Sequence, residues 1–291
     1  MLTNSQIAVA VVVVTVITFS LNLVLNLWFV LGMGWGIEGS AIGTLICQIA
    51  MAVALVWVLW RRTHGLDLSL VPHWGGIASS LRDGIPLLIR TLALRAALYV
   101  TTWVAARAGA ITMAAYQVTM TIWNLLLMTM DALGIAGQAL TGASLGAGDI
   151  RRTRLLTGTM TRWGVWAGVV IGALLAASHQ LVPAIYTNDP AVHRAVAAGL
   201  LVVAVEQVIA GPAFILDGVL IGAGDGRWLS RAQVVMFLVY LPMAWAVHLW
   251  APADPAAAVV WLWIAFGGFM AVRCGILAWR AHGDAWMRTG A

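Results

Sequence analysis

The sequence contains little charge and no lysine. Only 9% of its 291 residues are charged, whereas about a quarter are charged in an ordinary soluble domain, and 62% are hydrophobic. So few charges could not cover a core built from that much apolar surface in water. The scarcity of charge therefore excludes a soluble enzyme, a nucleic-acid-binding protein and a disordered chain. It predicts an integral membrane protein.

Cysteines and catalytic sequence patterns are also scarce. The two cysteines, Cys47 and Cys274, each lie within an apolar stretch, which favours packing residues over a metal site or a disulfide framework. The six histidines are scattered, and no H-E-x-x-H pattern or Ser/His/Asp order occurs. We therefore expect no catalytic residue, no cofactor, no metal and no nucleic-acid partner.

The sequence does contain a series of long apolar stretches. A helix of about 20 apolar residues spans the hydrocarbon core of a bilayer. The expected fold class is therefore an all-α polytopic transmembrane helix bundle with about eight spans, the sixth of them interrupted at Gly211-Pro212. The spans are expected at about residues 7–30, 40–60, 85–106, 114–140, 161–178, 195–221, 232–249 and 256–279.

The arginines predict how the spans are oriented. If the loop at 61–82 faces the cytoplasm, 11 arginines lie on the cytoplasmic side and two on the other. The positive-inside rule favours this arrangement, which places both termini in the cytoplasm. The cytoplasmic set is Arg61, Arg62, Arg82, Arg151, Arg152, Arg154, Arg162, Arg227, Arg231, Arg280 and Arg288, and the opposite loops hold Arg107 and Arg194.

Six charged residues lie inside the expected spans. An ion near the bilayer midplane costs roughly 2.5 kcal/mol or more, so such residues need an explanation. One interpretation is that the acids and arginines form structural ion pairs. The other is a gate, or a carboxylate that loads and releases a proton. The six are Arg90, Arg95, Arg273, Asp131, Asp217 and Glu206, and we expect each arginine to have an acidic or polar partner in the bundle.

Glycine spacing predicts close helix packing and two similar turns. Gly164, Gly168 and Gly172 recur every four residues, which would let another backbone approach closely. The segments 145–149 and 221–225 share the pattern Gly-Ala-Gly-Asp. We interpret each as a helix C-cap followed by an aspartate that caps the next helix. A phosphate-binding loop is the less favoured alternative.

Several polar motifs resemble, in order, those of the MATE (multidrug and toxic compound extrusion) transporters. Residues 34–44 resemble the turn that opens the sixth helix of that family, and residues 89–92 resemble its seventh helix in the DinF-type branch. Residues 131–149 resemble the end of the eighth helix. Residues 216–225, LDGVLIGAGD, resemble the tenth helix and the loop after it, which is the most specific match.

The resemblance implies twelve helices in two six-helix lobes with a drug cavity between them, of which this chain matches helices five to twelve. It implies that residues 1–60 form the last two helices of the N-terminal lobe, 61–82 a cytoplasmic inter-lobe linker and 83–291 the C-terminal six-helix lobe. The family's first four helices, with its usual coupling aspartate, have no counterpart here. The chain is therefore expected to be truncated.

The function implied is antiport coupled to protons or sodium ions, which exports drugs and toxic amphipathic compounds across the cell (plasma) membrane. The expected partners are membrane lipids, a small amphipathic or cationic substrate, and a missing N-terminal four-helix segment. Two alternatives stay open: a non-transporting remnant, and a membrane-embedded enzyme acting on lipid-linked substrates. Candidate substrate-cavity residues on the fourth span are Gln117, Met120, Asn124 and Met128, whose methionines could form a soft lining.

Overall fold

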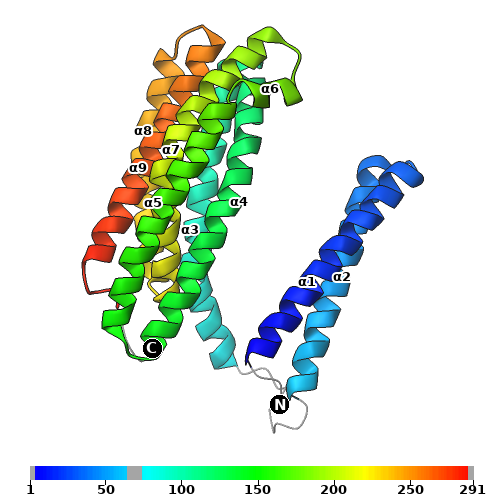
Figure 1. Ribbon diagram of the computed structural model, residues 1–291, viewed down its shortest axis with the longest axis vertical. Helices are drawn as coiled ribbons and strands as arrows, with labels where there is room; N and C mark the ends of the chain where they lie inside the picture. The colour runs from blue at the N-terminus through cyan, green and yellow to red at the C-terminus, as the bar shows by residue number, and fades with distance from the viewer. Residues whose placement is uncertain (1–3, 64–73, 288–291) are drawn as a thin grey trace. The chain divides into compact units, whose positions relative to one another are not determined.

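The computed structural model describes residues 4–63 and 74–287 (Figure 1). Within these ranges the chain is helical and no strand occurs. Eight of the described helices are long and apolar enough to cross a membrane, which confirms the expected all-α polytopic fold. The chain divides into two compact units, residues 1–73 and 74–291, which are described separately below.

The first unit is a helical hairpin. Helix α1 (Asn4–Leu27) continues into the π-helical segment η1 (Trp28–Gly32), and α2 (Gly36–Thr63) returns alongside it. The turn between them needs glycine, because Gly34 and Gly36 have φ angles of +70° and +54°. The ring of Phe29 stacks on that of Trp35 with the centroids 5.3 Å apart, which packs the two sides of the turn together.

The second unit is a bundle of six long helices and one short helix. Helix α7 lies at its centre, is the most buried of the spans, and packs against α4, α5 and α9 (Figure 1). The helices are α3 (Trp74–Arg107), α4 (Ala110–Gly146), α5 (Ile150–Ser178), α6 (Leu181–Tyr186), α7 (Pro190–Gly222), α8 (Gly226–Trp250) and α9 (Pro255–His282).

Glycines let the backbones of neighbouring helices touch α7. A Cβ atom added to Gly168 of α5 would lie 2.2 Å from the carbonyl oxygen of Gln207 on α7. A Cβ atom added to Gly218 of α7 would lie 2.0 Å from the carbonyl oxygen of Gly134 on α4. Both distances are far below van der Waals contact. The predicted glycine stripe on the fifth span is therefore confirmed as a helix–helix contact surface.

The expected break in the sixth span is wrong, because α7 runs continuously through Gly211-Pro212. In a membrane, an interrupted helix would leave backbone groups without hydrogen-bond partners. The close packing of α4 and α5 along α7 also favours the helical path. Proline is thus tolerated here without ending the helix.

Two segments expected to be loops are partly helical. Residues 74–82, expected as part of the linker, form the first turns of α3. The linker residues 64–73 lie outside the described residues, and so does Arg288, one of the arginines expected on the cytoplasmic side. The basic segment before the fifth span belongs to α5, which begins at Ile150. The Asp149 carboxylate caps this helix by accepting a hydrogen bond from the backbone N–H of Arg152 at 2.8 Å. Hydropathy marks only the apolar part of such helices, so it missed their polar first turns.

The two Gly-Ala-Gly-Asp turns share a backbone shape but use their aspartates differently. Gly148 and Gly224 have φ angles of +76° and +75°, as helix C-cap glycines do. Asp149 caps the next helix as predicted. Asp225 makes no such cap, because its carboxylate accepts a hydrogen bond from Arg280 Nε at 2.7 Å.

Candidate functional site

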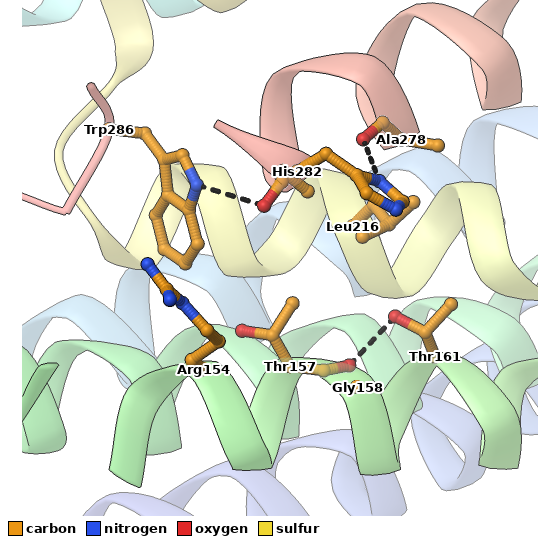
Figure 2. Close-up of a pocket in the computed structure, with 9 residues that line it drawn as sticks. Arg154, Thr157, Gly158, Thr161, Leu216, Ala278, His282 and Trp286 are labelled. Carbon is orange, nitrogen blue, oxygen red and sulfur yellow. Dashed lines mark hydrogen bonds between the residues drawn. The ribbon is translucent and has the colours of Figure 1, made fainter. Parts of the chain in front are cut away.

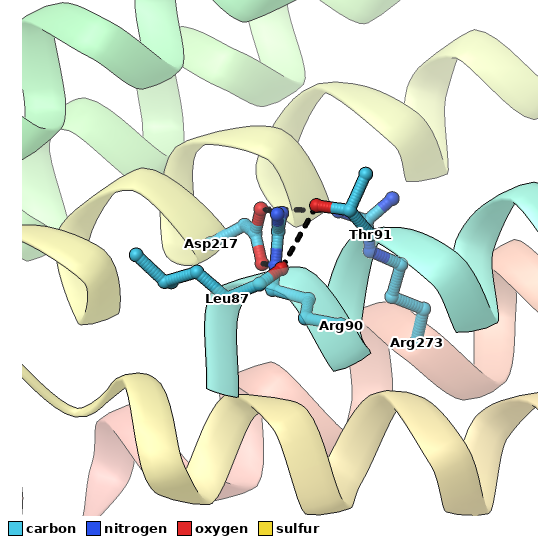
Figure 3. A network of polar contacts seen from close by, with 5 residues as sticks. All are labelled: Leu87, Arg90, Thr91, Asp217 and Arg273. Atoms are coloured by element: carbon cyan, nitrogen blue, oxygen red, sulfur yellow. Dashed lines mark hydrogen bonds and ion pairs between the residues drawn. The ribbon is translucent and has the colours of Figure 1, made fainter. Parts of the chain in front are cut away.

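Three charged side chains from different helices meet inside the second unit (Figure 3). Arg90 of α3 contacts the Asp217 carboxylate of α7 through two nitrogens, Nε lying 3.2 Å from Oδ1 and Nη2 pairing with Oδ2. Arg273 of α9 approaches the same carboxylate, with Nη2 3.2 Å from Oδ2. This confirms the expected pairing for two of the three intramembrane arginines. We call these three residues the charge cluster.

The charge cluster is deeply buried and carries more positive than negative charge. The side chains of Arg90, Asp217 and Arg273 are 16%, 8% and 1% exposed. The guanidinium of Arg273 also lies over the ring of Phe214, 5.0 Å from its centroid. Its Nε atom is buried and has no hydrogen-bond partner among the described residues. One carboxylate therefore holds two guanidinium groups, and Arg273 is only partly satisfied.

A second acid, Asp131 of α4, supplies negative charge from the surface. Asp131 is exposed, and it interacts electrostatically with both Arg90 and Arg273. The contact between Gly134 and Gly218 brings this part of α4 against α7 beside Asp217. Four of the six predicted residues are thus gathered in one region, with two positive and two negative charges.

Glu206 lies apart from the charge cluster, although it shares helix α7 with Asp217. The two positions are 11 residues apart in the chain, which corresponds to about 16 Å along a helix. Glu206 is 2% exposed, and its Oε1 accepts a hydrogen bond from Trp123 Nε1 at 3.1 Å. Its Oε2 is buried without a partner in the described part of the chain. Phe266 packs edge-on against the Trp123 ring, so Glu206 sits in aromatic surroundings rather than beside an arginine.

Arg95 does not join the charge cluster. Its position is five residues after Arg90, which turns it about 140° around α3. It is exposed and makes no ion pair with the residues that the structure describes. The expected acidic or polar partner for Arg95 is therefore wrong for this part of the chain.

The predicted cavity residues of α4 lie along one side of that helix. Gln117, Met120, Asn124 and Met128 follow one another at spacings of three or four residues, and Asp131 continues the row. Gln117 and Met128 are exposed, and the other two are half-buried. Their role in binding substrate stays a prediction.

Sequence reasoning missed a hollow at one end of the second unit. We call this the Arg-rich end, where α3, α5 and α8 begin and α4, α7 and α9 end. Figure 2 shows one hollow of about 310 Å³, formed by α5, α7, α9 and the segment after α9. Arg154, His282 and Trp286 line it, and Trp286 Nε1 donates a hydrogen bond to the carbonyl of Ala281 at 3.2 Å. No sequence pattern marks it, because its walls are far apart in the chain.

The eight long apolar helices and the charges buried among them define a polytopic membrane protein. Residues 86–246 match the MatE family model, which covers more than half of the chain. The protein therefore belongs to the MATE family. Its relatives are transporters rather than enzymes, so the alternative of a membrane-embedded enzyme is not supported. The DinF-type branch stays a prediction.

The relatives come from plants, animals and bacteria. The chain is 31% identical over 240 residues to Protein DETOXIFICATION 45, chloroplastic, from Arabidopsis thaliana, covering 82% of this chain and 41% of the relative. It is 25% identical over 233 residues to Multidrug and toxin extrusion protein 1 from Mus musculus, covering 78% and 41%. The chain thus spans about half the length of the curated relatives that it matches.

A solved structure has the same fold. It shows a multidrug resistance MATE family transporter of the MOP superfamily in an outward-facing conformation, and it matches with a TM-score of 0.78 at 18% identity. The match covers 93% of this chain and 62% of that chain. At this identity the likeness establishes the fold alone.

Proposed function

We propose that the chain works in cation-coupled export of small amphipathic compounds, with protons or sodium ions as the coupling ions. Family membership and the names of the relatives support this proposal. The observation that carries it is the charge cluster, in which Asp217 bridges α3 and α9 from the central helix α7. Charged residues are rare in membrane-spanning helices, and they mark gates and ion pathways when they occur.

The charge cluster is suited to act as a gate between α3, α7 and α9. While Asp217 is ionised, its carboxylate holds both guanidinium groups and so keeps the three helices together. A cation that binds the carboxylate would compete with Arg90 and Arg273 and loosen this contact. Asp131 would then be the remaining acid near the two arginines. The proposal is therefore a switch in which one bound cation changes how the helices pack.

Glu206 is the second proposed coupling residue. Its Oε1 is fixed by Trp123, while Oε2 has no hydrogen-bond partner among the described residues. A proton on Oε2, or a sodium ion beside it, would neutralise a carboxylate that no arginine balances. In this proposal Glu206 binds the coupling ion, whereas Asp217 controls how α3, α7 and α9 pack together.

The proposed orientation places the Arg-rich end and both termini in the cytoplasm of a cell (plasma) membrane. Helix-end arginines in the second unit cluster at that end, and Arg107 and Arg194 mark the other. The positive-inside rule supports this assignment. The arginines at the Arg-rich end are Arg82, Arg151, Arg152, Arg154, Arg227, Arg231 and Arg280.

The second unit is proposed to be the C-terminal lobe of the transporter, and the hairpin in residues 1–73 to be the last two helices of the other lobe. The exposed row on α4, which includes Gln117 and Met128, would face the substrate cavity. Transport then requires further helices that complete the other lobe, because alternating access needs two lobes around the site.

The proposed roles are tested by dye efflux from proteoliposomes that contain the chain joined to the first four helices of a MATE transporter of solved structure. Asp217→Asn should abolish efflux driven by a proton or sodium gradient. The matched control is Asp284→Asn, which removes an exposed acid paired with Arg154 and should leave efflux unchanged. Efflux at the wild-type rate in Asp217→Asn would contradict the gate.

A further inference from the structure

Glu206 has one carboxylate oxygen whose neighbours can decide which ion binds there. Its Oε1 accepts the hydrogen bond from Trp123 Nε1, while Oε2 is buried and has no hydrogen-bond partner in the described part of the chain. An ion that neutralises this carboxylate therefore binds at Oε2. The groups next to Oε2 determine whether a proton or a sodium ion is favoured.

Tyr240 of α8 lies in the same aromatic surroundings as Glu206. It is 1% exposed, and it interacts electrostatically with Glu206. Tyr240 and Trp123 both pack edge-on with Phe266 of α9, at ring-centroid distances of 6.2 and 5.2 Å. One ring thus holds both Tyr240 and the indole that binds Glu206.

The hydrogen of the Tyr240 hydroxyl is already committed to another residue. Thr101 Oγ1 of α3 lies 2.5 Å from the Tyr240 hydroxyl oxygen, and it also donates a hydrogen bond to the carbonyl of Ala97 at 2.8 Å. A hydroxyl group has one hydrogen to donate. Since Thr101 gives its hydrogen to Ala97, the Tyr240 hydroxyl donates to Thr101. The Tyr240 oxygen therefore meets any further neighbour as an acceptor.

An ionised Glu206 and this Tyr240 oxygen cannot hydrogen-bond to each other, because both are acceptors. The lack of a partner for Oε2 among the described residues agrees with this. A proton on Oε2 supplies the missing hydrogen, so that the carboxylic acid can donate to Tyr240. A sodium ion, like other hard cations, needs several oxygen ligands, whereas Trp123 and Phe266 offer an N–H group and ring carbons.

The other groups around this site are already engaged or lie at a distance. Tyr116 of α4 interacts electrostatically with Tyr240, but its hydroxyl donates a hydrogen bond to Met120 Sδ at 3.7 Å. Helix α5 meets α7 through Gly168 and Gly172, which have no side chains. The charge cluster is about 16 Å away along α7. The hydrogen-bond state of Tyr240 therefore decides the balance at Oε2.

We propose, on the basis of the coupling role proposed for Glu206, that Tyr240 selects the proton as the ion bound there. Proton transfer to Oε2 forms an O–H bond while an O–H bond of a hydronium ion breaks, which leaves a water molecule. The new O–H group donates to Tyr240, whose own hydrogen stays directed at Thr101. Tyr240 is thus a specificity-determining residue that stabilises protonated Glu206, and Thr101 fixes the direction of its hydrogen bond.

The test measures protonation of Glu206 by infrared spectroscopy on the purified chain in detergent. The protonated-carboxyl band that is lost in Glu206→Gln reports this residue. Tyr240→Phe removes the acceptor, so the affinity of Glu206 for protons should fall roughly tenfold, which moves its protonation to lower pH by about one unit. Sodium ions added at constant pH and ionic strength should leave the wild-type band unchanged.

A pair of threonine variants separates hydrogen-bond direction from packing. Thr101→Val frees the Tyr240 hydrogen to donate to the ionised carboxylate, so Glu206 should again protonate at lower pH, although Tyr240 is intact. Thr119→Val is the matched control, because Thr119 is also buried but accepts its hydrogen bond from Trp263 Nε1, at 2.9 Å. It should leave the titration unchanged, as should Thr101→Ser, which keeps the hydroxyl. Circular dichroism checks that all variants keep their helices.

Four results would overturn the proposal. Titration of Tyr240→Phe at the wild-type pH would remove Tyr240 from ion selection and leave the coupling role of Glu206 untouched. An equal shift in Thr119→Val would show a general effect of lost packing. Loss of the Glu206 band on addition of sodium ions would identify sodium as the preferred ion. Absence of the band at every pH at which the chain stays folded would contradict proton loading at Glu206 itself, and with it the proposed function of this residue.

Discussion

Arg273 and Asp217 face each other across the interface between α9 and α7, with Nη2 and Oδ2 3.2 Å apart. Arg273 is 1% exposed, and its Nε lacks a partner among the described residues, so this pair leaves a buried guanidinium only partly compensated. Such an arrangement is poorly suited to stability alone, since a buried ion pair often stabilises a fold no more than apolar residues would. Its position between three helices is consistent with the proposed gate.

Replacing Asp217 by alanine should strongly destabilise the second unit. The change leaves Arg90 and Arg273 buried without their carboxylate, and breaking a buried pair in this way costs about 3–5 kcal/mol. Thermal unfolding in detergent, followed by circular dichroism, measures the effect. Asp284→Ala removes an exposed partner of Arg154 and should change the melting temperature little. Equal melting temperatures for the two variants would contradict the structural part of the account.

Replacing Gly211 by alanine should separate α7 from α5. A Cβ atom at Gly211 would lie 2.0 Å from the carbonyl oxygen of Gly164, so the helices must move apart, at a cost of about 1–3 kcal/mol. Gly158→Ala is the control on α5, because nothing lies within 4 Å of its added Cβ atom. Alanine there should instead stabilise by roughly 0.5–1 kcal/mol through helix propensity. The same unfolding measurement detects the two effects, and a stabilised Gly211→Ala would refute the backbone contact.

Replacing Glu206 by glutamine should preserve the fold and abolish ion coupling. A glutamine carbonyl can still accept the hydrogen bond from Trp123 Nε1, but the neutral side chain can neither load a proton nor attract a sodium ion. In two-lobe proteoliposomes, efflux should lose its dependence on the imposed gradient while circular dichroism stays unchanged. Trp123→Phe, which removes the hydrogen bond but keeps the carboxylate, should retain gradient dependence. A Glu206→Gln variant that still responds to the gradient would exclude this residue from coupling.

Orientation can be checked by single cysteines at opposite ends of the bundle. In a chain whose Cys47 and Cys274 are replaced by serine, Ala147→Cys places a thiol in the turn between α4 and α5, and Thr187→Cys places one before α7. The arginine distribution predicts that a membrane-impermeant thiol reagent labels position 187 on intact cells, and position 147 only after permeabilisation. Labelling of both positions from one side would contradict the topology.

The sequence predicted the spans well because apolar length decides which segments cross a bilayer. It could not predict where the helices end, since the polar turns at the starts of α3 and α5 carry no hydropathy signal. It also predicted that the intramembrane arginines pair with acidic residues. It could not show which arginine forms such a pair. Arg90 and Arg95 both lie on α3, and only the folded bundle, in which α3 packs chiefly against α8, brings Arg90 to Asp217 of α7.

The surroundings of Glu206 could not be predicted either, because they depend on tertiary structure. Glu206 and Asp217 lie in the same expected span, and the sequence alone does not show which side chains surround each of them. Their surroundings differ because Trp123 packs near one and two arginines meet at the other. The hollow lined by Arg154, His282 and Trp286 combines residues of α5, α7, α9 and the segment after α9, so no local motif could reveal it.

The most direct test of the central claim is efflux of a cationic dye from proteoliposomes under an imposed proton or sodium gradient. The 291-residue chain alone should show no gradient-driven efflux, because in the proposed assignment six of its spans belong to one lobe and only two to the other. The same chain joined to the first four helices of a MATE transporter of solved structure should expel the dye, and should stop when the gradient is dissipated. Absence of efflux from this two-lobe protein, with its helices intact by circular dichroism, would contradict the proposed transport function.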